Sequence, residues 1–375
     1  MFEPVRAIYA FRPHAPAGLI AASVSVAALF ASTPFILTEI ADRFAVSLGT
    51  AGLISTVQVS SFAVASFLAG RFMRDHIDLL VIAAVIGMVG NLASAFAPTF
   101  AILLASRLVA GVAAGGLTWI AWADAVRDRR RLADIAATGP MTVIVAAPLL
   151  GWAVSAGGDR AVFVMLAAVH LPLLFLRTRV ELAPTRRVGP TRPRRSNHVL
   201  LAALAVATAG GSSLWVFTAA FGTSEIGLTP VVASFAFSLN AVAGLIGART
   251  RTRHGSGGWW LLGPAVSAMT LALFPNAAMF YLILVVWGAT WWLAVPDVLR
   301  SIASHTDAPD GRMGDAQAMM ALGRAAGPLL GGFVISESGF RSLGFVAGAT
   351  VTAAALAVVA VGVSRRSAHR SEVAV

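Results

Sequence analysis

Ionisable side chains within long apolar stretches are the first candidates for chemistry in this sequence of 375 residues. Arg107 and Arg324 each interrupt such a stretch, and a charge in an apolar environment is costly and usually functional. Arg107 has two interpretations. It could be a charged partner in proton or substrate handling, or a structural cation bonded to backbone carbonyls of the first or fifth helix. For Arg324 we expect a structural salt bridge, with Asp297 as its partner.

Two further side chains could bind and release a proton. Glu39 is the only carboxylate of the first two apolar stretches that lies within reach of a membrane. Its alternative interpretation is a permanently ionised residue at the membrane surface, beside Asp42 and Arg43. His170 could titrate instead, because an imidazole changes charge near neutral pH. The alternative for His170 is a hydrogen-bonded packing residue.

Motifs of soluble enzymes are absent from the sequence. A phosphate-binding Walker loop needs a lysine, and all 28 basic residues are arginines. The patterns HExxH, GxSxG and GxGxxG are missing too, and a chain without cysteine has neither a disulfide nor a thiolate metal site. We therefore expect no enzyme, no cofactor and no metal site.

The composition is that of a membrane protein. Hydrophobic residues make up 58% of the chain and charged residues 12%, against roughly 45–50% and 25% in soluble domains. The net charge of +11 would suit a nucleic-acid binder, but the arginines lie between apolar stretches and form no single patch. The partner that this pattern indicates is a lipid bilayer, and we expect no nucleic-acid partner.

A helix needs about 20 apolar residues to cross a bilayer, and twelve stretches meet this requirement. Very short links, such as 97–98 and 276–277, require consecutive helices to run antiparallel. The sequence therefore predicts an all-α membrane protein with twelve transmembrane helices. The predicted spans are 16–38, 50–71, 78–96, 99–123, 134–155, 160–177, 199–221, 229–248, 259–275, 278–299, 314–335 and 342–363.

The arginines predict the orientation of these spans. If both termini are cytoplasmic, the outer links hold three arginines, Arg43, Arg160 and Arg341, and 23 lie on the inner side. This asymmetry follows the positive-inside rule. We expect a protein of the inner cell membrane, with an Arg- and Pro-rich cytoplasmic linker at 178–197.

The two sides of this linker resemble each other. Pro148 and Gly151 in the fifth span have counterparts, Pro328 and Gly331, in the eleventh, and the two prolines are 180 residues apart. Such an internal repeat is typical of secondary transporters. We predict two pseudo-symmetric six-helix bundles, 1–177 and 198–375.

Glycines predict close helix packing in the eleventh span. Gly323, Gly327 and Gly331 recur every four residues and therefore share one helix face. A face without side chains lets a neighbouring backbone approach closely. Pro328 weakens the helix locally, which neighbouring helices can compensate within a membrane.

Several of these motifs resemble the major facilitator superfamily over essentially the whole chain. Arg107, Gly111 and Gly115 resemble an arginine-and-glycine motif in the fourth helix of its proton-coupled drug exporters. The glycine spacing of the eleventh span is similar to the family's antiporter motif, which in that family lies in helix five; here helix five keeps only Pro148 and Gly151. The Trp287-Gly288 and Pro296 pattern resembles the drug- and sugar-efflux branch.

The loop after helix two departs from the family's pattern. The family has an aspartate before an arginine there, whereas Arg74 precedes Asp75 in this chain. If this loop acts as an inner-side charge latch, its salt bridges must differ, and we expect Arg71 or Arg74 to pair with Asp124. Asp297 and Arg324 would form the corresponding pair of the second half.

The resemblance implies a transporter whose helices one, four, seven and ten line a central cavity. Trp119 and Trp122 would then face Trp287 and Trp291, with Asn240 among the polar groups, which suits an amphipathic organic substrate. The alternative is a belt of aromatic residues at the inner membrane surface. We expect a monomer that exports a small organic compound in exchange for protons. The alternatives are uptake of a sugar or metabolite and a non-transporting membrane receptor.

Overall fold

The computed structural model describes residues 13–72, 78–126, 128–176, 178, 195–250, 252, 255–303 and 309–373, and every element within these ranges is a helix. The first half contains α2 (Ala17–Phe44), α3 (Leu48–Ala51), α4 (Leu53–Phe72), α5 (Leu79–Ala95), α6 (Phe100–Ala125), α7 (Arg129–Ala168) and α8 (Leu171–Phe175). The second half contains α9 (Arg195–Trp215), α10 (Thr218–Ser224), α11 (Pro230–Arg249), α12 (Gly257–Leu273), α13 (Ala277–Ala303) and α14 (Pro309–Val373).

These helices confirm the predicted twelve-span architecture. Eight segments are long and apolar enough to cross a membrane, and α5 and α12 are shorter apolar helices. Two of the eight segments each contain two consecutive spans. One comprises α7 and α8, and the other lies in α14. The kinks lie at Gly158 (φ 62°) and Gly339 (φ 75°), where positive φ favours glycine because it has no Cβ. Both kinks therefore fall at matching places in the internal repeat.

Several helices continue past the ends that the apolar residues predicted. α2 ends at Phe44 instead of 38, and α13 ends at Ala303 instead of 299. Apolar residues are required only inside the hydrocarbon, whereas backbone hydrogen bonds continue the helix into its polar ends. The sequence pattern therefore located the spans but not the full helices.

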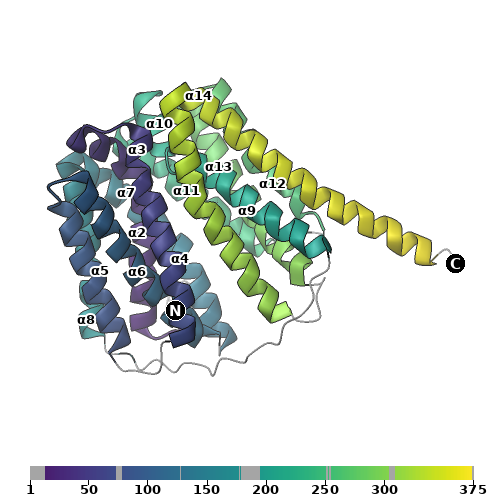
Figure 1. The fold of residues 1–375 in the computed structure, drawn as a ribbon, viewed down its shortest axis with the longest axis horizontal. Coiled ribbons are helices and arrows are strands. Elements are labelled where there is room, and N and C mark those ends of the chain that lie inside the picture. The colour runs from purple at the N-terminus through teal and green to yellow at the C-terminus, as the bar shows by residue number, and fades with distance from the viewer. Residues whose placement is uncertain are drawn as a thin grey trace, which may run out of the picture.

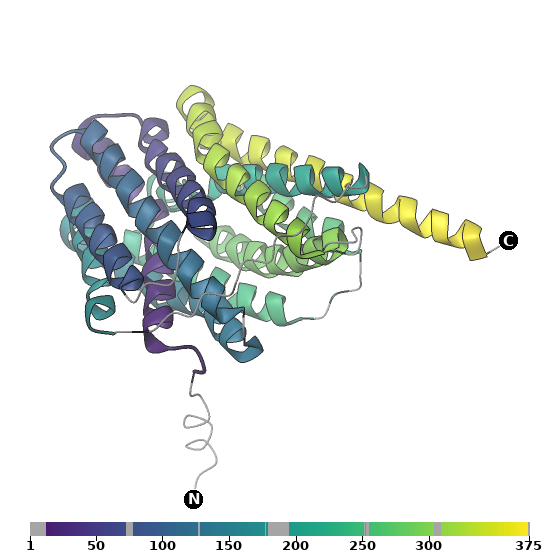
Figure 2. The same ribbon diagram turned by 60° about the horizontal axis from the view of Figure 1, so that its bottom comes forward.

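The two halves lie side by side, as Figures 1 and 2 show. They meet where α7 packs against α11 and where α3 and α4 pack against α14. Two contacts mark this junction: Ser238 Oγ donates a hydrogen bond of 2.8 Å to the carbonyl of Ile144, and Ser47 Oγ lies 3.3 Å from Ser336 Oγ. We call the end of the molecule that carries α3 and Ser336 the closed end, and the opposite end, where α2 begins, the linker end.

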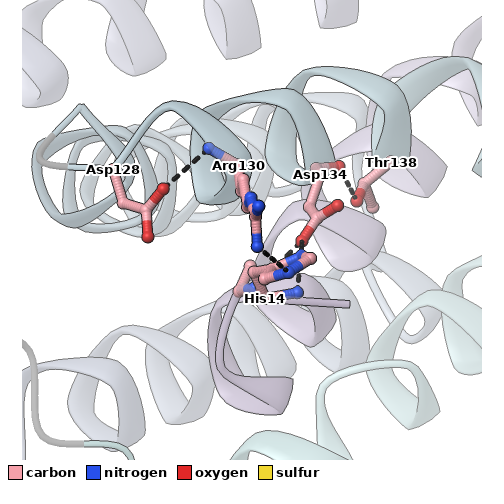
Figure 3. Close-up of polar contacts among 6 residues, drawn as sticks. His14, Asp128, Arg130, Asp134 and Thr138 are labelled. Carbon is pink, nitrogen blue, oxygen red and sulfur yellow. Dashed lines mark hydrogen bonds and ion pairs between the residues drawn. The ribbon is translucent and has the colours of Figure 1, made fainter. Parts of the chain in front are cut away.

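At the linker end, the start of α2 is attached to α7 through Asp134 (Figure 3). The Asp134 carboxylate accepts hydrogen bonds from the backbone N–H groups of His14 and Ala15, at 2.6 and 3.0 Å. Arg130 Nη1 lies 3.4 Å from the imidazole of His14. His14 and Ala15 precede the first residue of α2, Ala17, so Asp134 binds the segment that leads into the helix. These contacts fix the position of α2 against α7.

Candidate functional site

A cavity of about 300 Å³ lies between the two halves. Residues of α2, α4, α9, α11, α13 and α14 line it, so both halves contribute to its wall. The lining residues are Phe30, Thr33, Pro34, Ser55, Val59, Phe62, Thr208, Gly211, Ser212, Trp215, Val216, Asn240, Trp287, Gly288, Trp291, Trp292, Ala321 and Arg324.

Aromatic rings form much of this wall. The Trp215 and Trp287 ring centroids lie 6.1 Å apart, and Phe30 meets Phe62 edge to face at 5.1 Å. The Trp287 and Trp291 indoles lie beside Gly211 of α9, where a Cβ would be 3.6 and 3.8 Å from them, an ordinary contact distance. Such rings offer flat apolar surfaces for an organic ligand.

Polar groups are few and placed between the rings. Asn240 Nδ2 donates a hydrogen bond of 2.7 Å to the carbonyl of Leu284, which leaves its side-chain oxygen available as an acceptor. The hydroxyls of Thr208 and Ser212 donate to carbonyls of their own helix at 2.7 and 2.6 Å, so their lone pairs remain available. Arg324 adds the only charge among the described lining residues.

The structure places only some of the predicted aromatic residues at this cavity. Asn240, Trp287 and Trp291 line the cavity, whereas Trp119 and Trp122 do not. Trp122 is 42% exposed, and the Trp119 indole lies over Gly70 of α4. No described residue of α6 lines this cavity; α4, which packs against both α6 and α14, contributes Ser55, Val59 and Phe62 instead.

Several lining residues had not been assigned to the cavity: Phe30 in α2, Ser55, Val59 and Phe62 in α4, Trp215 in α9, and Ala321 and Arg324 in α14. A periodic signal was present in the sequence. Thr208, Gly211, Ser212 and Trp215 recur at the spacing of one helix face, and Ser55, Val59 and Phe62 do the same.

The predicted pair of Asp297 and Arg324 is wrong. Asp297 accepts a hydrogen bond from Arg300 Nη1 at 3.2 Å and others from the backbone N–H groups of Gly255 and Gly257, at 3.4 and 2.7 Å. Asp297 therefore holds the start of α12, while Arg324 lies in the cavity wall.

Only part of the predicted latch of the first half can be described. Asp124 forms an ion pair of 2.9 Å with Arg131 of α7. The side chains of Arg71, Arg74 and Asp75 lie outside the described residues. Their predicted pairing with Asp124 therefore stays a prediction.

Arg107 is fully buried inside the first half, away from the cavity. Its Nη2 donates a hydrogen bond of 3.0 Å to Asn91 Oδ1 of α5, and its guanidinium lies 5.0 Å from the ring centroid of Phe163. The partner is thus a side chain of the third span and not a carbonyl of the first or fifth. His170 lies nearby, buried, with Nδ1 2.8 Å from the Leu166 carbonyl and its ring against Gly87.

Glu39 lies half-buried at the closed end, where its carboxylate faces the kink at Gly158. It makes no hydrogen bond or ion pair with another described residue. Beside it, Arg43 and Asp159 form a buried ion pair of 2.7 Å that sequence reasoning missed. Arg43 also donates to the carbonyls of Ala95 and Ala97 at 3.1 and 2.6 Å, which caps the end of α5.

Three glycines of α14, spaced four residues apart, pack against α9. Gly323, Gly327 and Gly331 meet the carbonyls of Ala205, Ala209 and Ser213, which also recur every four residues. In the first half, Gly111 and Gly115 of α6 meet the carbonyls of Gln58 and Phe62 in α4. Gly151, one turn after Pro148 in α7, faces the backbone of Pro230 and the side chain of Ser234 in the other half.

Among the described residues, no three His, Cys, Asp or Glu side chains come together as a metal site would require. What the geometry offers is a cavity that could bind an organic molecule, enclosed by helices of both halves. Buried charges outside the cavity, at Arg107 and at the Arg43–Asp159 pair, lie within the first half.

A family model described as Major Facilitator Superfamily matches residues 18–317. The chain is 26% identical to a protein of Pseudomonas aeruginosa (strain PAO1) named transcription regulatory protein OpdE, over 90% of this chain and 92% of the relative.

Two solved structures share the fold at low sequence identity. One is a bacterial homologue of the human lysosomal transporter Spinster in an inward-facing and occupied conformation, with a TM-score of 0.68, 15% identity, and 99% and 98% of the two chains covered. The other is a POT family transporter in complex with a thioalcohol-conjugated peptide, with a TM-score of 0.72, 11% identity, and 90% and 94% covered.

Proposed function

Because this chain belongs to the Major Facilitator Superfamily, we propose that it is a secondary transporter that exports a small amphipathic organic compound in exchange for protons. The observation that carries the proposal is the cavity between the halves, with its aromatic wall and few polar groups. A site shared by two repeats is what alternating access requires, since rocking one half against the other exposes it to each side in turn.

The closed end is suited to such a movement. Gly49 of α3 and Gly332 of α14 meet backbone to backbone, and Gly151 faces Pro230 in the symmetric contact. Contacts of small residues can separate without unpacking large side chains. The antiporter-like glycine spacing of α14 supports export as the direction.

Glu39 is our candidate for proton coupling. Its carboxylate lies beside the α7 kink and has no partner among the described residues, so protonation would break no ion pair there. In the proposed orientation, with both termini cytoplasmic in the inner membrane, Glu39 lies near the outer surface. There it would exchange protons with the outside when the closed end opens.

The substrate would first be found by comparing growth of cells with and without the gene across antibiotics and sugars. Efflux of the compound so identified should collapse with an uncoupler and in Glu39→Gln. Glu225→Gln should leave it unchanged, because Glu225 is the exposed counterpart in the second half. Efflux that survives both the uncoupler and Glu39→Gln would exclude proton exchange and favour facilitated transport. A facilitated transporter would carry the compound inward as well as outward.

A second candidate is a membrane receptor that binds a small molecule without moving it. The name of the Pseudomonas aeruginosa relative, a transcription regulatory protein, favours this candidate. Counterflow in proteoliposomes separates the two functions. A transporter accumulates labelled compound against preloaded unlabelled compound, whereas a receptor binds the label and accumulates none.

A further inference from the structure

Arg324 gives the cavity a positive charge that no described residue neutralises. Its side chain is exposed to the cavity, and it forms no hydrogen bond or ion pair with any other described residue. Nearby acids are engaged or distant. Asp297 is held by Arg300 and by the start of α12, and Asp315 lies nine residues earlier on α14, about 13 Å along the helix.

The backbone position of Arg324 is fixed. The preceding residue, Gly323, packs against Thr208 and the carbonyl of Ala205 in α9, and Ser212 Oγ donates a hydrogen bond of 3.3 Å to the Gly323 carbonyl. The guanidinium is therefore carried by a tightly packed helix pair whose free hydroxyl lone pairs also line the cavity. The fixed backbone keeps the Arg324 side chain at the cavity wall.

The remaining wall selects the rest of the ligand. Trp287 and Trp291 face the same cavity from α13, and Phe30 and Phe62 face it from the first half. A charge withdrawn from water is destabilised unless it is paired. A neutral sugar would leave Arg324 unpaired, and a cation would be repelled.

We propose that the cavity selects amphipathic organic monoanions, with Arg324 binding the anionic group and the tryptophans holding a ring-containing body. This specificity rests on the proposed function of the cavity as the substrate site. A cavity of about 300 Å³ fits a body of about two fused rings, at the lower end of ligand pockets.

The test is equilibrium binding of three probes with one body to the purified full-length protein: naphthalene-2-carboxylate, naphthalene-2-carboxamide and 2-(aminomethyl)naphthalene. We expect the carboxylate to bind about tenfold or more tightly than the carboxamide, and the amine most weakly, because charge-assisted hydrogen bonds are the stronger ones. Equal binding of the three, a preference for the amine, or no measurable binding of the carboxylate would overturn the proposal.

Substitutions of Arg324 test whether this residue causes the preference for the carboxylate. Arg324→Gln should lower carboxylate affinity about tenfold or more and leave carboxamide affinity within a factor of about three, while Arg324→Lys should retain a preference for the carboxylate. Arg341→Gln is the control, since Arg341 is an exposed arginine of α14 beyond the kink at Gly339 and outside the cavity. A carboxylate preference that survives Arg324→Gln would contradict the assignment. The comparison of the three probes uses the unaltered protein, so its result does not depend on whether any variant folds.

Counterflow distinguishes this proposal from the proposed function. Arg324-dependent binding of the carboxylate without counterflow would support the anion site and contradict transport. Counterflow of neutral or cationic compounds that is unaffected by Arg324→Gln would support transport and contradict the anion site.

Discussion

The ring of Phe35 in α2 lies 4.8 Å, centroid to centroid, from the ring of Phe237 in α11. This contact joins the two halves of the protein. Phe237 lies 5.0 Å from Trp215, and Trp215 lies 6.1 Å from Trp287 in the cavity wall. An aromatic series thus connects the cavity to the interface between the halves. A ligand that moves Trp287 or Trp215 would therefore disturb the Phe35–Phe237 contact at this interface.

Phe237→Ala should weaken the packing between the two halves at this contact. The expected result is faster maleimide labelling of a cysteine placed at Thr33, a buried residue of the cavity wall, when the reagent is added from the closed end. The chain has no cysteine of its own, so the reporter has no background. Phe235→Ala is the control, because Phe235 is 48% exposed on the same helix. Equal labelling rates in the two variants would refute the role of Phe237.

Gly327→Leu should prevent α14 from packing on α9. A Cβ at this position would begin 2.5 Å from the Ala209 carbonyl, and backbone cannot move aside cheaply. We expect loss of folded protein or a melting temperature lower by several degrees, measured by thermal unfolding in detergent. Gly314→Leu on the same helix should be neutral or slightly stabilising, since its Cβ would meet nothing within 4 Å. Similar melting of both variants would contradict the packing argument.

Arg43→Ala should destabilise the first half strongly. It would leave the Asp159 carboxylate buried without its partner at 2.7 Å and would uncap the carbonyls at the end of α5. Removing one partner of a buried pair costs about 3–5 kcal/mol. Arg160→Ala removes an exposed arginine one residue beyond Asp159 and should change the unfolding free energy by less than about 0.5 kcal/mol. An equally small effect of Arg43→Ala would exclude a structural role for the pair.

Asn91→Ala should lower stability by about 2 kcal/mol, because it removes the hydrogen-bonding partner of the buried Arg107 guanidinium. In an Arg107→Met background the same substitution should cost less, since no buried cation then needs the partner. A double-mutant cycle of unfolding free energies measures this coupling. Additive effects of the two substitutions would show that the bond contributes nothing to stability.

The sequence predicted well which residues share a helix face, but poorly which helix or cavity that face contacts. The four-residue spacing of Gly323, Gly327 and Gly331 identified a close-packed face, but nothing in it named α9 as the partner. Trp119 and Trp122 share a face just as Trp287 and Trp291 do, yet only the second pair reaches the cavity. Local periodicity fixes which residues point together, and tertiary packing decides what they meet.

Charge pairing failed for a related reason. Asp297 was assigned to Arg324 because both lie toward the same end of the second half. Arg300, three residues along the same helix, reaches Asp297 without any tertiary contact, and such i,i+3 neighbours are placed together by the helix itself. Arg324, which has no ion-pair partner among the described residues, lies in the cavity wall instead.

Alternating access is the central claim, and spin labels at Ser47 and Ser336 test it most directly. These residues belong to different halves, and their hydroxyls lie 3.3 Å apart at the closed end. In the reconstituted protein, pulsed dipolar spectroscopy should record a short-distance population that matches this contact and a second, longer one. Labels at Ser47 and Ala156, both in the first half, should give one unchanged distance. A single short distance between Ser47 and Ser336 under every substrate and pH condition would contradict the account.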